Sequence, residues 1–138
     1  MDPKIEEIAK KYDFKLIVLF GSYGTPSYNP IDSDIDIAVL PNGDANSVDL
    51  RLKEIYIDFA LYFKKGKIDI INLITAPVLL KQQVSQHGTM LYQQAEGVYD
   101  TYMDYYQKLF MENIEYFKEK HRKNMEEIEE ALKKWETQ

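Results

Sequence analysis

The feature that most constrains this chain is a short apolar segment, residues 34–40 (DIDIAVL), that opens with two aspartates. Side chains alternate between the two faces of a strand, so Asp34 and Asp36 project from one face and the isoleucines from the other. From residue 37 onward the segment has no polar alternation, which predicts burial on both faces. Two neighbouring carboxylates at the start of such a strand repel each other, which favours a functional role.

A hard divalent cation removes this repulsion, and Mg²⁺ typically takes one or two carboxylates together with substrate phosphates and waters. An Asp-x-Asp pair on a strand therefore offers ligands for two metal ions in phosphoryl or nucleotidyl transfer. Taken alone, the pair is more often the polar face of an exposed strand. The functional interpretation of the pair gains support from the preceding sequence. An apolar segment over residues 15–20 ends at Gly21-Ser22, and Ser22 stands twelve positions before Asp34. Glycine lets the backbone approach a phosphate closely, and the Ser22 N–H and hydroxyl can donate to phosphate oxygens.

The other elements follow from apolar periodicity and turn residues. Asp2 is expected to cap a first helix, and one continuous helix is expected from Ser47 to the break at Gly66. Strands are predicted at residues 15–20, 34–40, 67–73 and 89–92, and helices at 3–12, 47–65, 75–86 and from 98 onward. The last helical region is too long for one helix of a globular domain, so a break is predicted within residues 118–123.

Two groups of side chains stand out in the C-terminal helices. Tyrosines are frequent there, and they suit either a protein interface or packing on the chain's own sheet. Four apolar residues recur at steps of three and four, a narrow seam for packing on another helix. The tyrosines are Tyr99, Tyr102, Tyr105, Tyr106 and Tyr116, and the seam residues are Met125, Ile128, Leu132 and Trp135.

Composition excludes several classes of protein. The 138 residues fit one ordinary domain, and 45% are hydrophobic, enough for a core. The net charge of −6 argues against a nucleic-acid backbone binder. There is no cysteine, no apolar run of membrane-spanning length and no signal-peptide pattern at Met1, so we expect a cytoplasmic protein without membrane contact. His87 and His121 have no partner at ligand spacing, and Asp58 is expected at the surface.

The order of these motifs resembles the nucleotidyltransferases of the DNA polymerase β superfamily. Phe20-Gly21-Ser22, a loop, and Asp34-Ile35-Asp36-Ile37 match their pattern, and the likeness is closest to the minimal nucleotidyltransferases (MNT). It extends to about residue 95 through residues 67–73, 75–80 and 87–92. Two features depart from the minimal enzymes: eleven residues instead of ten separate Ser22 from Asp34, and Pro26 stands where they carry glycine.

The resemblance implies an α+β fold with a small mixed sheet flanked by helices. It implies a catalytic domain over residues 1–95, and residues 96–138 as helices that pack on this domain or on a partner. It further implies two Mg²⁺ ions and ATP as the substrate. The implied catalytic and metal-binding residues are Asp34, Asp36 and Asp69, and the implied nucleotide-binding residues are Gly21, Ser22 and Ser33.

Proteins similar to this chain are commonly the antitoxin of HEPN–MNT toxin–antitoxin pairs. The resemblance thus implies a hetero-oligomer with a helical HEPN ribonuclease, in which the antitoxin transfers AMP to a tyrosine of the toxin. Two alternatives stay open. The chain could neutralise its partner by binding alone, or it could modify a small molecule such as an antibiotic.

Overall fold

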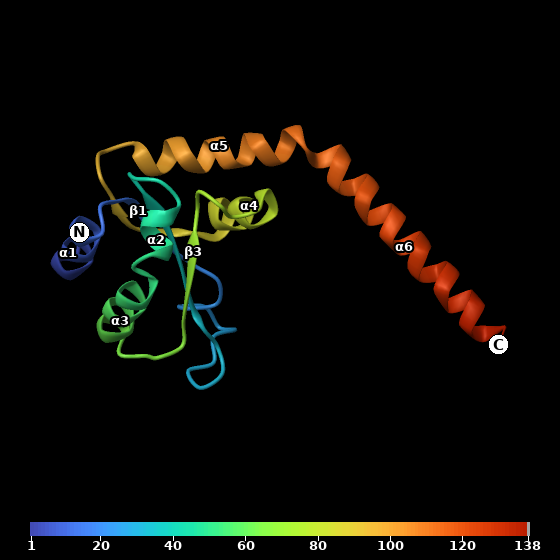
Figure 1. Ribbon diagram of the computed structural model, residues 1–138, viewed down its shortest axis with the longest axis horizontal. Helices are drawn as coiled ribbons and strands as arrows, with labels where there is room; N and C mark the ends of the chain where they lie inside the picture. Colours follow the sequence, from blue (N-terminus) through green and yellow to red (C-terminus); the bar gives the residue numbers. More distant parts are fainter. Residues whose placement is uncertain (138) are drawn as a thin grey trace.

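The sheet at the centre of the molecule is mixed and has four strands, in the order β3-β2-β1-β4. In the computed structural model, which describes residues 1–137, β1 pairs antiparallel with β2 and with β4, whereas β2 and β3 are parallel. Helices cover both faces (Figure 1). The elements are α1 (Pro3–Lys11), β1 (Phe14–Phe20), β2 (Ile35–Pro41), α2 (Asn46–Asp49), α3 (Leu52–Phe63), β3 (Ile68–Asn72), α4 (Val78–His87), β4 (Thr89–Gln93), α5 (Val98–Glu112) and α6 (Ile114–Glu136).

Two apolar clusters lie on opposite faces of the sheet, because successive side chains of β1 and β2 point in opposite directions. Ile37 and Val39 join the cluster beneath α1 and α3, whereas Ala38 and Leu40 join the cluster beneath α4 and α5. Residues 37–41 of β2 are all buried. The predicted α+β class, the mixed sheet and the burial of this strand on both faces are confirmed.

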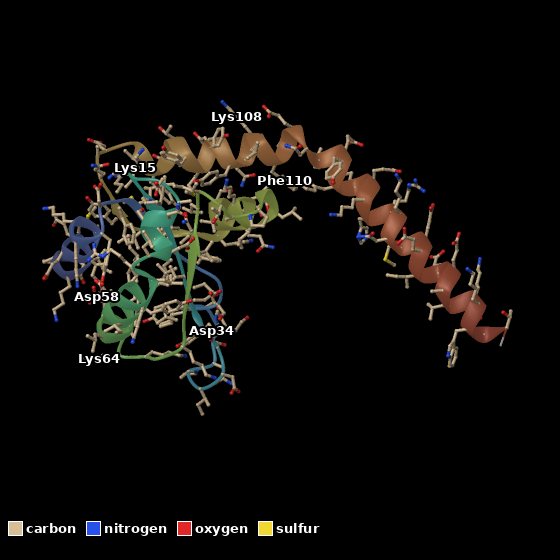
Figure 2. All side chains as sticks on the ribbon, in the orientation of Figure 1. Lys15, Asp34, Asp58, Lys64, Lys108 and Phe110 are labelled. Carbon is tan, nitrogen blue, oxygen red and sulfur yellow. The ribbon has the colours of Figure 1, made fainter. Side chains whose placement is uncertain are left out.

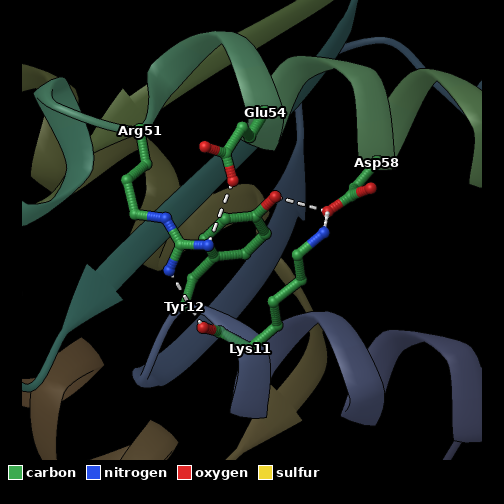
Figure 3. A network of polar contacts seen from close by, with 5 residues as sticks. All are labelled: Lys11, Tyr12, Arg51, Glu54 and Asp58. Carbon is green, nitrogen blue, oxygen red and sulfur yellow. Dashed lines mark hydrogen bonds and ion pairs between the residues drawn. The ribbon is translucent and has the colours of Figure 1, made fainter.

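A network of partly buried polar side chains joins the end of α1 to α3 (Figure 3). Asp2 caps α1 as predicted, accepting hydrogen bonds from the Lys4 and Ile5 N–H groups at 2.8 and 3.4 Å. Asp58 of α3, expected at the surface, is only half-buried: it accepts a hydrogen bond from the Tyr12 hydroxyl and pairs with Lys11 Nζ at 2.9 Å. Asp58 is thus at the surface as expected, but the end of α1 covers part of its side chain.

The helix expected from Ser47 to Gly66 is divided and ends early. Residues 50 and 51 separate the single turn of α2 from α3, and Lys64 ends α3 in the left-handed conformation at φ 54°. Gly66 is therefore two residues beyond the actual stop. A lysine with a positive φ is uncommon, and nothing in its side chain signals this position in the sequence.

The C-terminal helices also differ from prediction in one respect. The break lies at Asn113, not within residues 118–123. Asn113 leaves the helical conformation at φ −109° and ψ 5°, and its side-chain amide donates to the Leu109 carbonyl at 2.7 Å. This amide satisfies a carbonyl at the end of α5, which marks the break without glycine or proline.

The tyrosines of α5 and α6 differ in how far they are buried. Tyr106 is buried with Met103 beneath α5, and Tyr99 and Tyr102 pack against the same cluster. Tyr105 and Tyr116 are more than half exposed. Beyond Asn113, α6 extends away from the sheet (Figure 1). No helix within the described residues is long and apolar enough to cross a membrane.

Candidate active site

The aspartate pair lies where the chain enters β2 from the loop over residues 21–34. Asp34 directly precedes the strand and is exposed, whereas Asp36 is the second residue of the strand and half-buried. Figure 2 shows Asp34 at the end of the sheet beside this loop. Because Ala38 and Leu40 pack beneath α4 and α5, Asp36 two positions earlier faces the same side.

Asp69 lies beside the pair on the neighbouring strand. In the parallel register of β2 and β3, Asp36 is directly opposite Asp69. Asp69 is exposed on β3, which is an edge strand. Burial raises the pKa of Asp36 above its ordinary value, and the carboxylates of Asp69 and Asp34 raise it further. The three predicted acids therefore lie close enough for the charges of Asp34 and Asp69 to act on Asp36, which lies opposite Asp69 in the sheet.

Gly21 allows Asp36 to occupy its position. The preceding residue, Phe20, is the register partner of Asp36 across the β1–β2 ladder. Gly21 has φ +79°, and a Cβ added there would lie 2.0 Å from Asp36 Oδ2. The space that a side chain would need at residue 21 is thus occupied by the carboxylate. Sequence reasoning assigned this glycine to phosphate approach alone and missed its contact with the aspartate.

A cavity of about 510 Å³ opens beside these residues. Gly21, Ser22 and Asp36 form part of its wall, whereas Ser33, Asp34 and Asp69 are not part of the lining. Two residues of α4 complete the lining, and the sequence predicts no role for either. The lining residues are Phe20, Gly21, Ser22, Thr25, Ser27, Asp36, Gln83 and His87.

His87 and Gln83 could have been noticed only with the topology in hand. They lie four residues apart on α4, and therefore on one face of the helix. They are about fifty positions from Asp36 in the sequence, so no local motif joins them. The sequence indicates no function for His87, because it has no partner at ligand spacing and the sequence does not show which residues the fold brings together.

The loop between the two motifs has a defined internal structure. The Ser22 carbonyl accepts from the Thr25 N–H at 2.9 Å, and Gly24 takes φ +79° within this turn. Ser33 hydrogen-bonds within the loop, as expected: its hydroxyl oxygen accepts from the Asn29 N–H at 3.0 Å. Gly24, not residue 26, supplies the left-handed conformation, so Pro26 is accommodated.

The far side of the same loop is attached to the end of α3. Lys65 Nζ donates to the Tyr28 hydroxyl at 2.5 Å and to the Pro30 carbonyl at 2.9 Å. The Tyr23 ring packs edge-on against Phe63, with centroids 5.6 Å apart. These contacts hold the loop from behind and leave the Gly21-Ser22 side facing the cavity.

The donor set fits magnesium. The candidate ligands are carboxylate oxygens, which a hard cation prefers, and substrate phosphates and waters usually supply its remaining ligands. Within residues 1–137, no group of three or more His, Asp or Glu side chains is already arranged to hold a metal ion. Without a cation, mutual repulsion opposes a closer approach of these carboxylates.

A glycine-serine turn, an adjacent cavity and carboxylates on the parallel β2–β3 pair indicate a class of protein: one that transfers phosphoryl or nucleotidyl groups. Comparison with known families agrees. The family described as "Polymerase beta, Nucleotidyltransferase" matches residues 3–97, so the chain belongs to it and is a nucleotidyltransferase. The predicted likeness to this superfamily is confirmed.

Solved structures extend the similarity beyond that region. A toxin–antitoxin complex with AMP-PNP contains a chain 28% identical, covering 84% of this chain and 94% of its own, with a TM-score of 0.58. The toxin–antitoxin MntA-HpeT, with two aspartates two positions apart changed to glutamate, matches at 28% identity, the same coverages and a TM-score of 0.57.

A third similar structure is the complex of a tri-AMPylated HEPN toxin with its MNT antitoxin from Shewanella oneidensis. It matches at 28% identity, covers 84% of this chain and 92% of its own, and has a TM-score of 0.53. Curated proteins give no match. The predicted resemblance to MNT proteins is thus confirmed by the solved structures.

Proposed function

We propose that this nucleotidyltransferase is the antitoxin of a HEPN–MNT pair and transfers AMP from ATP to a tyrosine hydroxyl of its cognate HEPN toxin. The observation that carries the proposal is the placement of Asp36 against Gly21 in the cavity wall, with Asp34 and Asp69 close by. The similar complex with AMP-PNP supports ATP as the donor, and the complex with a tri-AMPylated HEPN toxin supports the toxin as the acceptor protein. A cytoplasmic hetero-oligomer is part of the proposal.

Each residue has a role in this reaction. Asp34 and Asp36, joined by Asp69, would hold two Mg²⁺ ions, which would neutralise charge on the triphosphate. Gly21 and Ser22 bind the β- and γ-phosphates through the backbone and the serine hydroxyl. Ser33 maintains the loop that carries Ser22, through its hydrogen bonds to Asn29. The domain over residues 1–95 carries all these groups, and residues 96–138 form the helical extension.

The chemistry is an in-line displacement. The tyrosine oxygen forms a bond to the α-phosphorus while the bond to the bridging oxygen breaks and pyrophosphate leaves. Asp69 is exposed beside Asp36 and accepts the hydroxyl proton. Magnesium, when bound, neutralises the charge of the triphosphate and its leaving group. The remaining residues act by positioning the phosphates, which is the main contribution of proteins to phosphoryl transfer.

The test is intact-mass spectrometry of the cognate HEPN protein after incubation with this chain, Mg²⁺ and ATP. We expect a gain of one or more AMP units that is lost with Asp34→Ala. Asp34 is exposed, so this substitution should leave the fold intact. Asp49→Ala, at another exposed aspartate, is the matched control and should retain transfer. Binding of the two proteins without a mass gain would instead favour a non-catalytic antitoxin.

A further inference from the structure

The exposed seam on α6 is an apolar feature that the active site does not use. None of the described residues of α6 is buried. Met125, Ile128, Leu132 and Trp135 are 44%, 52%, 55% and 76% exposed. A helix in a protein gains most of its stability from packing of its apolar face. This face therefore needs a partner.

The spacing of the seam assigns a heptad position to each residue of the helix. Steps of three and four place residues 118, 125 and 132 at heptad position a, and residues 121, 128 and 135 at position d. Arg122 and Glu129 then occupy the flanking e positions, and Asn124 and Ala131 occupy the g positions. The one basic and the one acidic residue beside the central part of the seam are thus seven residues apart on the same edge.

These positions complement each other when two copies of α6 lie antiparallel. The register that places Met125 opposite Ile128 of the second copy also places Arg122 opposite Glu129. Twofold symmetry repeats both contacts, so two apolar layers are flanked by two ion pairs. The outer layers place Leu132 against His121, and Trp135 against Lys118, where an ammonium group can lie over the indole ring.

A parallel pair is disfavoured by the same residues. It would place Lys118 against Lys118 and His121 against His121 within the seam. It would also pair Arg122 with Phe117 and Glu129 with Asn124 at the edges, which leaves both charges without a complement on the opposite helix. The charge pattern therefore selects both the orientation and the partner, which is a second copy of this chain.

We propose that α6 is a dimerisation helix, which forms an antiparallel two-stranded coiled coil with α6 of a second copy over residues 118–135. Because α6 extends away from the sheet, the two catalytic bodies lie at opposite ends of the paired helices (Figure 1). Only two layers are apolar on both sides, so the interface is small and the dimer dissociates in the micromolar range, about 1–100 µM. The proposal concerns assembly and does not depend on nucleotidyl transfer.

The test is sedimentation equilibrium of the full chain from about 1 to 500 µM, a range chosen to bracket that affinity. R122E and E129R should each weaken self-association at least about tenfold, because each converts two ion pairs into two repulsive contacts. An equimolar mixture of R122E and E129R should form a heterodimer, since opposite charges then face each other again. The double variant R122E/E129R should self-associate like the wild type.

Matched controls make the same charge changes away from the seam. K123E and E130R lie at the outward f position and should leave the dimer unchanged. Circular dichroism of each variant verifies that α6 remains helical, because R122E also removes the ion pairs of Arg122 with Glu119 and Glu126. A chain that stays monomeric throughout the range, or charge variants without effect, would overturn the proposal. Occupation of the seam by a HEPN protein alone would overturn it equally.

Discussion

At Asp36, the positions of the neighbouring acids create a conflict between stability and function. The side chain is half-buried between two other carboxylates, so its charge is unfavourable when no cation is present. We expect Asp36→Asn, which keeps the shape and removes the charge, to raise the thermal midpoint of the metal-free protein by about 2–4 °C. Transfer should fall at least about a thousandfold. Thermal denaturation in EDTA measures the first effect.

Magnesium provides a second measurement for the same variant, independent of activity. Addition of Mg²⁺ with a non-hydrolysable ATP analogue should raise the midpoint of the wild type and raise that of Asp36→Asn much less. Asp49→Asn, at an exposed position of α2, is the control and should respond like the wild type. A decrease in the metal-free midpoint of Asp36→Asn would contradict the assigned electrostatic conflict.

Gly21 and Gly24 offer a matched pair for testing why the turn contains glycine. Both have φ +79°, but a Cβ at Gly21 would lie 2.0 Å from Asp36 Oδ2, whereas a Cβ at Gly24 meets nothing within 4 Å. Gly24→Ala should therefore cost only backbone strain, about 1 kcal/mol, and retain transfer within about tenfold. Gly21→Ala should cost about 2–3 kcal/mol and reduce transfer more than about a hundredfold, because Asp36 must move. Urea unfolding and initial rates measure both; equal effects would refute the contact.

At the scale of the elements, the α1–α3 contact should make stability depend on pH at both extremes. Burial raises the pKa of Asp58, but hydrogen bonds from Tyr12 and Lys11 outweigh it and leave the pKa below 3.8. A lowered carboxyl pKa stabilises the fold above the unfolded value, and the contribution is lost as pH falls below about 4. Burial and Asp58 raise the pKa of Tyr12 to about 12, so its contribution is lost between about pH 10 and 12.

Substitutions isolate this contribution. Asp58→Asn should lower the free energy of unfolding at pH 7 by about 1–2 kcal/mol, and the difference from the wild type should shrink below pH 4. Tyr12→Phe keeps the ring and removes the hydroxyl, so it should remove the part of the alkaline loss of stability that Tyr12 contributes. Urea unfolding across the pH range measures both. A pH-independent difference between Asp58→Asn and the wild type would exclude the ionised network.

The elements also indicate how far sequence alone could lead. β1 and β2 were predictable because each is a short, continuous apolar run, and a run of this length beside a loop rich in turn residues is typical of a buried strand. The stop at Lys64 and the break at Asn113 were not, because they depend on a strained lysine conformation and a side-chain hydrogen bond without a strong sequence signal. His87 was missed for a different reason: only the packing of α4 places it in the cavity with Asp36.

At the scale of the whole molecule, the folded body and α6 have separate sources of stability. Both apolar clusters are built from residues between Ile5 and Tyr106, and the described residues of α6 contribute no buried side chain. Contacts at the junction are limited to a few side chains, among them the stacked rings of Phe110 and Phe117. The body should consequently fold without α6.

Removal of residues 114–138 should therefore leave a cooperative thermal transition whose midpoint lies within about 3 °C of that of the dilute full chain. Near-ultraviolet circular dichroism follows the body, because Tyr92 and Tyr106 are buried within it. The full chain should also gain stability as its concentration rises through the micromolar range, since dimerisation stabilises only the folded form, whereas the shortened chain should not. Loss of the cooperative transition on shortening would mean that α6 supports the body through contacts other than burial. A thermal midpoint that depends on concentration in the shortened chain would instead place the dimer contact on the body.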